Sequence, residues 1–190
     1  MSDMAVEYER FPFSADMFFR MGDLGFFADD ERPVELLDGE IVVMPTPSPE
    51  HQYVVRKLST IFHRLFFDRA AIDVNGPLRV SDSSVPLPDL TLLALRDHDY
   101  KHATPGAEDT LLAVEVSVST LSYDRGRKLR AYARAGVTEV WIVNVGERRV
   151  ERYADPSGSA YATVEHVLPN AQIAARAFPQ DAIEVGEFMP

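Results

Sequence analysis

The sequence predicts an α/β or α+β fold in which helices flank a mixed central β-sheet. Short apolar runs bounded by turn residues, typical of buried strands, alternate along the chain with segments whose apolar residues recur at helical spacing. An apolar strand around Glu115, a helix over about 124–135 and a strand over 138–144 follow one another, and such a unit normally joins two parallel strands. The length of 190 residues predicts a single domain, residues 1–190.

The first third of the chain predicts a helix, a hairpin and a long helix. The segment Ser14–Met21 has a good N-cap in its serine and reads as a short helix. Asp38-Gly39 separates two apolar flanks, and this dipeptide is a strong signal for a two-residue hairpin turn. Ser48-Pro49-Glu50 has the residues that begin a helix, and apolar side chains at spacings of three and four continue that helix to about Asp68.

The middle of the chain predicts mainly strands. Residues 71–75 and 77–81 have the composition of two strands separated by an Asn-Gly turn. A leucine-rich strand begins at Asp89, and the polar segment 96–109 is expected to form a loop because it contains a Pro-Gly turn. A second apolar strand follows at 111–117.

The last third predicts one more helix and a group of antiparallel strands. Gly136 is well placed to end the helix at 124–135, because glycine readily adopts the left-handed conformation of a C-terminal cap. The strand at 138–144 is expected to form a hairpin with residues 149–154. A further meander is expected from residue 161 towards the C-terminus.

Composition limits the possible functions. The net charge is −11, which argues against tight, nonspecific binding to DNA because nucleic-acid binders usually carry a basic surface. The chain has no cysteine, which excludes disulfides, zinc–thiolate sites and cysteine nucleophiles. The acidic N-terminus has no apolar core, so we expect no signal peptide, and no apolar run is long enough to span a bilayer. We therefore expect a cytoplasmic protein that is not in a membrane.

Two acidic residues lie in apolar strands where a charge is costly. Asp89 begins one strand and Glu115 lies within another. A lone buried carboxylate costs several kcal/mol unless it is paired, protonated or bound to a metal. Mg²⁺ usually takes one or two protein carboxylates together with water and phosphate oxygens. With Lys128 on the next helix to stabilise negative charge, this set predicts a site that binds a divalent cation and attacks a phosphate.

A purely structural role is the alternative for each of these residues. Asp89 could be an exposed turn acid after proline, and Glu115 could be a buried acid paired with an arginine. Lys128 could form an ordinary surface ion pair with Asp124, four residues earlier on the same helix face. For His51, a neutral imidazole in a first helical turn is favoured over a base or a phosphate contact. Tyr123, Tyr132 and Trp141 are expected to be core or interface residues.

Four stretches of the chain carry a family resemblance. In order, they are Glu35-Leu-Leu-Asp-Gly-Glu40, Ser48-Pro-Glu-His-Gln52, Pro88-Asp89, and a long block from Val114 to Asn144. With Glu115 and Lys128 they resemble the PD-(D/E)XK, restriction endonuclease-like superfamily and, more closely, the Uma family of bacterial restriction endonucleases. The similarity runs from about Met17 to Tyr153, and the long block is its most specific part.

The resemblance implies a restriction endonuclease-like core with a mixed central sheet. It implies that Asp89 and Glu115 are metal ligands, that Lys128 is the catalytic lysine, and that Glu35 is the N-terminal acid that often completes such sites. For Glu35 the alternative, a solvated acid of the hairpin, is equally open. In most of the superfamily the acid and the lysine lie two residues apart on one strand. Here that position is Ser117, so the lysine comes from the following helix.

The leading hypothesis from the sequence is an Mg²⁺-dependent endonuclease that hydrolyses DNA, with Mn²⁺ as a substitute for Mg²⁺. A homodimer is expected, because cutting both strands of a duplex requires two sites. The alternative is a catalytically inactive nucleic-acid- or protein-binding module on a nuclease scaffold, which the net charge favours. A third hypothesis is an unrelated metal-dependent hydrolase of small phosphoesters.

Overall fold

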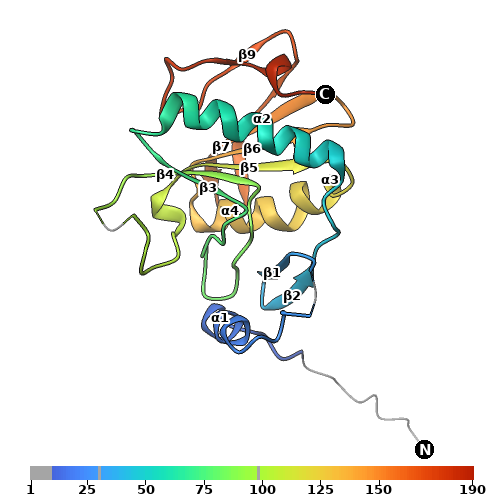
Figure 1. Ribbon diagram of the computed structural model, residues 1–190, viewed down its shortest axis with the longest axis vertical. Helices are drawn as coiled ribbons and strands as arrows, with labels where there is room; N and C mark the ends of the chain where they lie inside the picture. Colours follow the sequence, from blue (N-terminus) through green and yellow to red (C-terminus); the bar gives the residue numbers. More distant parts are fainter. Residues whose placement is uncertain (1–9, 30, 98) are drawn as a thin grey trace, which may run out of the picture.

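A mixed sheet of six strands forms the centre of the described structure, with the strand order β3-β4-β5-β6-β7-β8 (Figure 1). The computed structural model describes residues 10–29, 31–97 and 99–190, so the N-terminal segment in which we expected no signal peptide lies mostly outside the described residues. The strands are β3 (Ala71–Val74), β4 (Leu90–Leu93), β5 (Thr110–Ser117), β6 (Glu139–Asn144), β7 (Arg149–Ser157) and β8 (Ala160–Val167).

The predicted parallel unit is confirmed. Strands β5 and β6 pair in parallel, with Glu115 opposite Ile142, whereas the other neighbouring pairs of this sheet are antiparallel. The connection between them is one helical segment made of α3 (Leu121–Tyr123), a π-helical turn at Asp124–Lys128 and α4 (Leu129–Ala135). Gly136 ends it at φ +83°, in the left-handed conformation expected for this cap.

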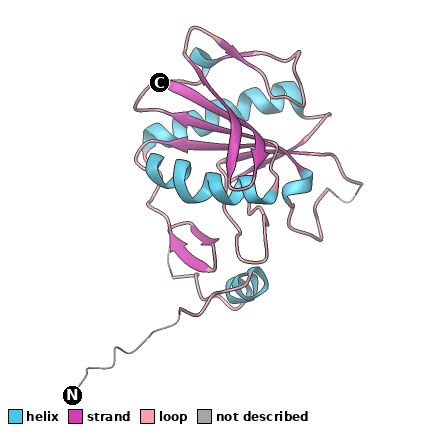
Figure 2. Ribbon diagram, turned by 180° about the vertical axis from the view of Figure 1, so that it is seen from behind, coloured by secondary structure: helices cyan, strands magenta, loops and turns pink. Residues whose placement is uncertain are grey.

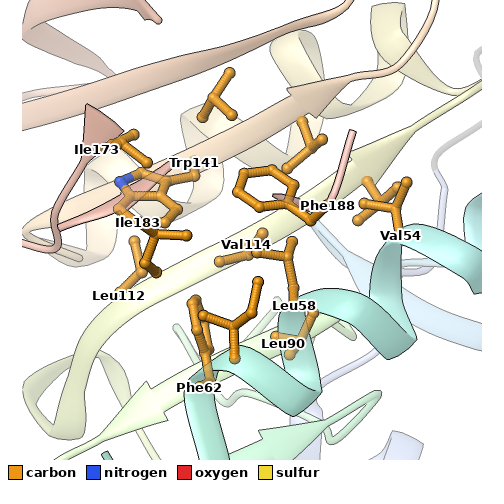
Figure 3. Close-up of a cluster of buried hydrophobic side chains, with 14 of the residues drawn as sticks. Val54, Leu58, Phe62, Leu90, Leu112, Val114, Trp141, Ile173, Ile183 and Phe188 are labelled. Carbon is orange, nitrogen blue, oxygen red and sulfur yellow. The ribbon is translucent and has the colours of Figure 1, made fainter. Parts of the chain in front are cut away.

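Helices lie on both faces of the central part of the sheet (Figure 2), whereas the edge strand β8 is mostly exposed. Helix α2 (Pro49–Phe66) covers one face, where the C-terminal segment with β9 (Gln172–Ile173), β10 (Ile183–Glu184) and the turn Val185–Glu187 also packs. Helix α4 covers the other face. In Figure 3 a set of apolar side chains fills the space under α2: Val54, Leu58, Phe62, Leu90, Leu112, Val114, Trp141, Ile173, Ile183 and Phe188.

Side chains of β5 alternate between these two faces, as the pleat of a strand requires. Leu112, Val114 and Val116 belong to the core under α2, whereas Ala113 belongs to the core under α4. Glu115 therefore points to the α4 side, where apolar packing would normally continue. Among the described residues, no helix combines the length and the hydropathy needed to cross a lipid bilayer.

A small N-terminal unit packs against one end of this core (Figure 1). It consists of α1 (Ala15–Asp23) and a hairpin of β1 (Val34–Leu37) and β2 (Glu40–Val43). The turn residues Asp38 and Gly39 both have positive φ, +51° and +76°, so the predicted Asp-Gly turn is confirmed. The hairpin is held by backbone hydrogen bonds in both directions between Leu36 and Val85, which bring β1 close to the start of β4.

The prediction of a strand at residues 77–81 is wrong. Only single bridges form there, from Arg79 to Gly106 and from Ser81 to Ser84, because Pro77 lacks a donor and the serine-rich end of the segment turns back on itself. This loop nevertheless supplies the backbone that supports β1 and, through Leu87, one part of the site below.

Candidate active site

The register of two antiparallel strands brings the predicted carboxylates together. Leu90 of β4 pairs with Val114 of β5, so Asp89 and Glu115, one residue further on each strand, lie opposite one another. The backbone N–H of Val116 donates to Asp89 Oδ2 at 2.7 Å, which locks this arrangement. The two acids therefore lie at one end of the sheet, close to each other.

Glu115 is only 3% exposed, and both of its oxygens have a partner. Lys128 Nζ lies 2.8 Å from Oε2, and the hydroxyl of Tyr132 donates to Oε1 at 2.5 Å. Burial and the neighbouring carboxylates Asp124, Asp89 and Glu35 hold the pKa of the Glu115 carboxyl well above its usual range, although the Lys128 charge opposes them. Besides this burial, three carboxylates and one ammonium act on Glu115.

Lys128 lies between two buried acids. Its ammonium contacts Glu115 and also Glu35 Oε1, at 2.9 Å, and it donates to the carbonyl oxygen of Leu87 at 3.2 Å. Burial lowers the pKa of Lys128, but the charges of Glu115 and Glu35 outweigh it and raise that pKa well above its usual range. Since an ammonium has three donors, all of them are used here.

Glu35 reaches this cluster from the N-terminal hairpin. It is 1% exposed on β1, and its Oε1 also accepts from the backbone N–H of Leu87 at 3.0 Å. The hydroxyl of Tyr123 donates to Oε2 at 3.3 Å. Glu35 therefore fixes Lys128 relative to the loop before β4, which is more than a solvated hairpin acid would do.

The π-helical turn adds a fourth carboxylate. Asp124 is 3% exposed and accepts at Oδ2 from the hydroxyls of Ser117 and Thr120, each at 2.6 Å. Burial raises the pKa of the Asp124 carboxyl, against the lowering effects of Lys128 and these two hydroxyls. A π-turn inserts one extra residue into a helix and often occurs at functional sites. Here it turns both Asp124 and Lys128 towards the end of the sheet.

Asp89 has a second partner on α2. The imidazole Nε2 of His51 lies 3.0 Å from Asp89 Oδ1, while Nδ1 of this histidine is buried without a partner among the described residues. His51 lies in the first turn of α2, which Ser48 caps through its hydroxyl. The first turn of α2 therefore orients one of the two predicted ligands.

The acids of the site, His51 and Lys128 line one cavity of about 630 Å³, a volume within the usual range for small-molecule sites. The loop at Met44–Pro47, the start of α2, the loop at Val118–Thr120 and the end of β3 enclose it. Four carboxylates and one lysine contribute to its wall: Glu35, Asp89, Glu115, Asp124 and Lys128.

The donor set of the cavity fits a divalent cation. Within the described residues no three acidic or histidine side chains converge on one point as a preformed metal site. Mg²⁺, however, needs only one or two protein carboxylates when water and phosphate oxygens complete its shell. Asp89 and Glu115 would supply that pair. Burial, and after it the charges of Asp124, Asp89 and Glu35, raise the pKa of Glu115, and a cation would offset both effects.

Comparisons with known proteins agree with this fold and with the family resemblance. A model of the Uma2 family, described as "Putative restriction endonuclease", matches residues 15–186. The chain belongs to the Uma2 family. Among solved structures, a "putative nuclease belonging to DUF820" from Anabaena variabilis is similar over 93% of this chain and 97% of its own, with a TM-score of 0.72. Because the two sequences are only 15% identical, this match shows the fold of the Uma2 chain and not its function. No curated protein sequence matches it.

All four predicted site residues of this Uma2 protein line the cavity. Their ion-pair partners differ from those expected if the residues had a purely structural role. Lys128 pairs with Glu35 and Glu115 instead of Asp124, and Glu115 pairs with a lysine instead of an arginine. Trp141 is a core residue, as expected.

Sequence reasoning missed four contributors to the site, of which Asp124 was considered only as a surface partner of Lys128. Tyr132 and Tyr123 are buried or partly buried as expected, yet their hydroxyls bind the site acids. His51 contacts Asp89, although a structural role was favoured for it. The sequence did contain a signal for these roles. His51 lies in one of the stretches that carry the family resemblance, and both tyrosines lie in another.

A further buried acid, outside the cavity, anchors the π-turn. Glu151 on β7 is fully buried and accepts from Arg125 Nε at 2.7 Å, Asn144 Nδ2 at 2.8 Å and the Tyr153 hydroxyl at 2.9 Å. Burial raises the pKa of Glu151, but these hydrogen bonds outweigh it and lower the pKa to about 2. Because Arg125 lies within the π-turn, Glu151 fixes the segment that carries Asp124 and Lys128.

We expect Glu151→Gln to lower the free energy of unfolding by about 3 kcal/mol at pH 7. A carboxyl whose folded pKa is depressed stabilises the protein above its unfolded pKa, near 4.5, and loses this effect as the pH falls towards 2. The difference between wild type and variant should therefore shrink between pH 4.5 and pH 2. Urea denaturation across this range measures it, with the exposed Glu184→Gln as control. A difference that does not change with pH contradicts this role.

Proposed function

We propose that this Uma2 protein is an Mg²⁺-dependent endonuclease that hydrolyses DNA phosphodiester bonds. The observation that carries the proposal is the meeting of Asp89, Glu115 and Lys128 from two strands and a π-turn at the wall of one cavity. A buried lysine beside a pair of carboxylates is costly for a purely structural purpose, since buried ion pairs contribute little net stability. Membership in a family described as restriction endonucleases supports the same chemistry.

Asp89 and Glu115 would hold the cation, with Mn²⁺ able to replace Mg²⁺. When bound, Mg²⁺ would polarise a phosphate oxygen of the substrate and lower the pKa of a water molecule. Val116 N–H and His51 keep Asp89 oriented, and Tyr132 does the same for Glu115. This fixed geometry matters because misplaced ligands lose much of their effect on a transition state.

Lys128 would stabilise the negative charge that develops on the phosphate during attack. Its three donors are taken by Glu35, Glu115 and Leu87, so it acts on the phosphate through its charge or after one of these donors changes partner. Glu35 would act as the positioning acid for Lys128. Because cutting both strands of a duplex needs two such cavities, we also propose a homodimer that works in the cytoplasm.

The first test is calorimetric titration of Mg²⁺ and Mn²⁺ into wild type and Asp89→Asn. We expect saturable binding by wild type and a loss of affinity of about 100-fold or more in the variant, because a ligand contributes at least as much as the groups that orient it. Asp68→Asn, which changes an exposed carboxylate after α2, is the matched control. Equal metal binding by wild type and Asp89→Asn would contradict the metal assignment.

A binding module without activity is the second candidate. The net charge of −11 and the saturated donors of Lys128 favour it. Incubation of the metal-loaded protein with plasmid and single-stranded DNA separates the two candidates. Hydrolysis that requires Glu115 supports the nuclease, whereas DNA binding without turnover supports the module.

A further inference from the structure

Helix α2 places a positively charged side chain, that of Arg56, at the cavity. Gln52 and Arg56, four residues apart and therefore on one helix face, are both exposed and line the cavity. The opposite side of the helix carries Val54 and Leu58 into the core, as Figure 3 shows. The same packing that fixes α2 on the sheet thus holds Arg56 beside the carboxylate cluster.

Arg56 differs from the neighbouring arginines in having no side-chain partner in the described structure. Arg64 on the same helix pairs with Glu187, and Arg69 just beyond the helix pairs with Asp181. Among the described residues that line the cavity, Lys128 is the other permanent cation, and it is already held by Glu35 and Glu115. Arg56 is therefore the cavity cation whose donors are available to a ligand.

A ligand with phosphates needs such a group here. The protein carries a net charge of −11, and the inner wall of the cavity is acidic, so both repel a polyanion. A guanidinium at the rim offers planar, paired donors that match the oxygens of a phosphate. The amide of Gln52, one helical turn away, offers further donors to the same ligand.

We propose that Arg56 binds the backbone phosphate next to the one that is cleaved, and so sets the position of the nucleic-acid strand along the cavity. This inference rests on the proposed nuclease function. Arg56 would contribute to substrate binding in the ground state and the transition state alike, since the neighbouring phosphate does not change in the reaction. Its loss should therefore raise KM and leave kcat largely unchanged.

The test is binding of a short, labelled, single-stranded oligonucleotide, measured by fluorescence anisotropy with Ca²⁺ in place of Mg²⁺. We expect Arg56→Gln to raise Kd by about tenfold at low salt, the usual size for a hydrogen bond to a charged group. The slope of log K against log salt should fall in magnitude by about 0.7, which corresponds to one lost phosphate contact on a single strand. Arg56→Lys should keep the slope and lose part of the affinity, because it retains the charge without the paired donors.

Lys57→Gln is the matched control. Lys57 is the next residue of the same helix, is also exposed, lies over the Tyr53 ring at 5.6 Å and does not line the cavity. Removal of either charge changes the net charge equally, so a general electrostatic effect would alter both variants alike. We expect Lys57→Gln to bind like wild type, and both variants to keep the wild-type melting temperature.

Equal Kd and salt slope for Arg56→Gln and wild type would overturn the inference, as would equal losses in Arg56→Gln and Lys57→Gln. The failure of the proposed function would look different. If the oligonucleotide binds in an Arg56-dependent way but is not hydrolysed with Mg²⁺ or Mn²⁺, the phosphate contact stands and the nuclease proposal falls. If hydrolysis depends on Glu115 but KM is unchanged in Arg56→Gln, the nuclease proposal stands and this inference falls.

Discussion

Glu115→Gln is expected to lower kcat/KM for DNA hydrolysis by about 10³-fold or more, because a lost carboxylate ligand removes several kcal/mol of charge stabilisation from the transition state. Glutamine keeps the shape of the side chain and can still bind Tyr132 and Lys128, so the protein should remain folded. The measurement is the initial rate of cleavage with saturating Mg²⁺, together with the melting temperature of each preparation.

Glu139→Gln provides a demanding control for this experiment. Glu139 is fully buried on β6, the parallel neighbour of β5, and is bound by Arg152 and Trp141, but it does not line the cavity. Its replacement should cost stability while the folded protein keeps its activity. If Glu115→Gln cleaves DNA at the wild-type rate, or if both variants lose activity equally, Glu115 is not a ligand in the reaction.

The local pattern of the sequence was sufficient to predict where two of the acids lie. A polar residue in a strand of apolar neighbours is conspicuous, and Asp89 and Glu115 were both identified in this way. The strand–helix–strand unit around Glu115 was also predictable, because the helical spacing of 124–135 and its glycine cap are local signals. Pairing of β4 with β5 then follows from their order, and it places the two acids side by side.

The remaining contacts depend on packing that no local signal contains. Glu35 Oε1 contacts Lys128, 93 positions further along the chain, only because the hairpin docks on the loop at Val85. An ideal α-helix would place Asp124 and Lys128 on one face as ion-pair neighbours. The π-turn changes this geometry, so that Asp124 binds hydroxyls and Lys128 binds two glutamates. Insertion of one residue into a helix is a tertiary effect, since the Arg125–Glu151 pair anchors it from another strand.

Lys128→Met is expected to destabilise the protein by about 3–5 kcal/mol, because it leaves Glu35 and Glu115 buried without a counter-charge. Since a domain of this kind has a total stability of roughly 5–15 kcal/mol, much of it would be lost. Urea denaturation at pH 7 measures the effect. The variant should also be inactive, which by itself does not separate a catalytic lysine from a structural one.

The double variant Glu35→Gln/Lys128→Met makes this separation. Removal of one buried carboxylate together with the ammonium keeps the local charge balance closer to that of wild type, so we expect a large part of the lost stability to return. Activity should not return, because no cation remains at that position to stabilise charge on the phosphate. If stability and activity recover together, Lys128 serves only to neutralise Glu35 and Glu115. If neither recovers, the cost of losing Lys128 arises from lost packing and not from unpaired charge.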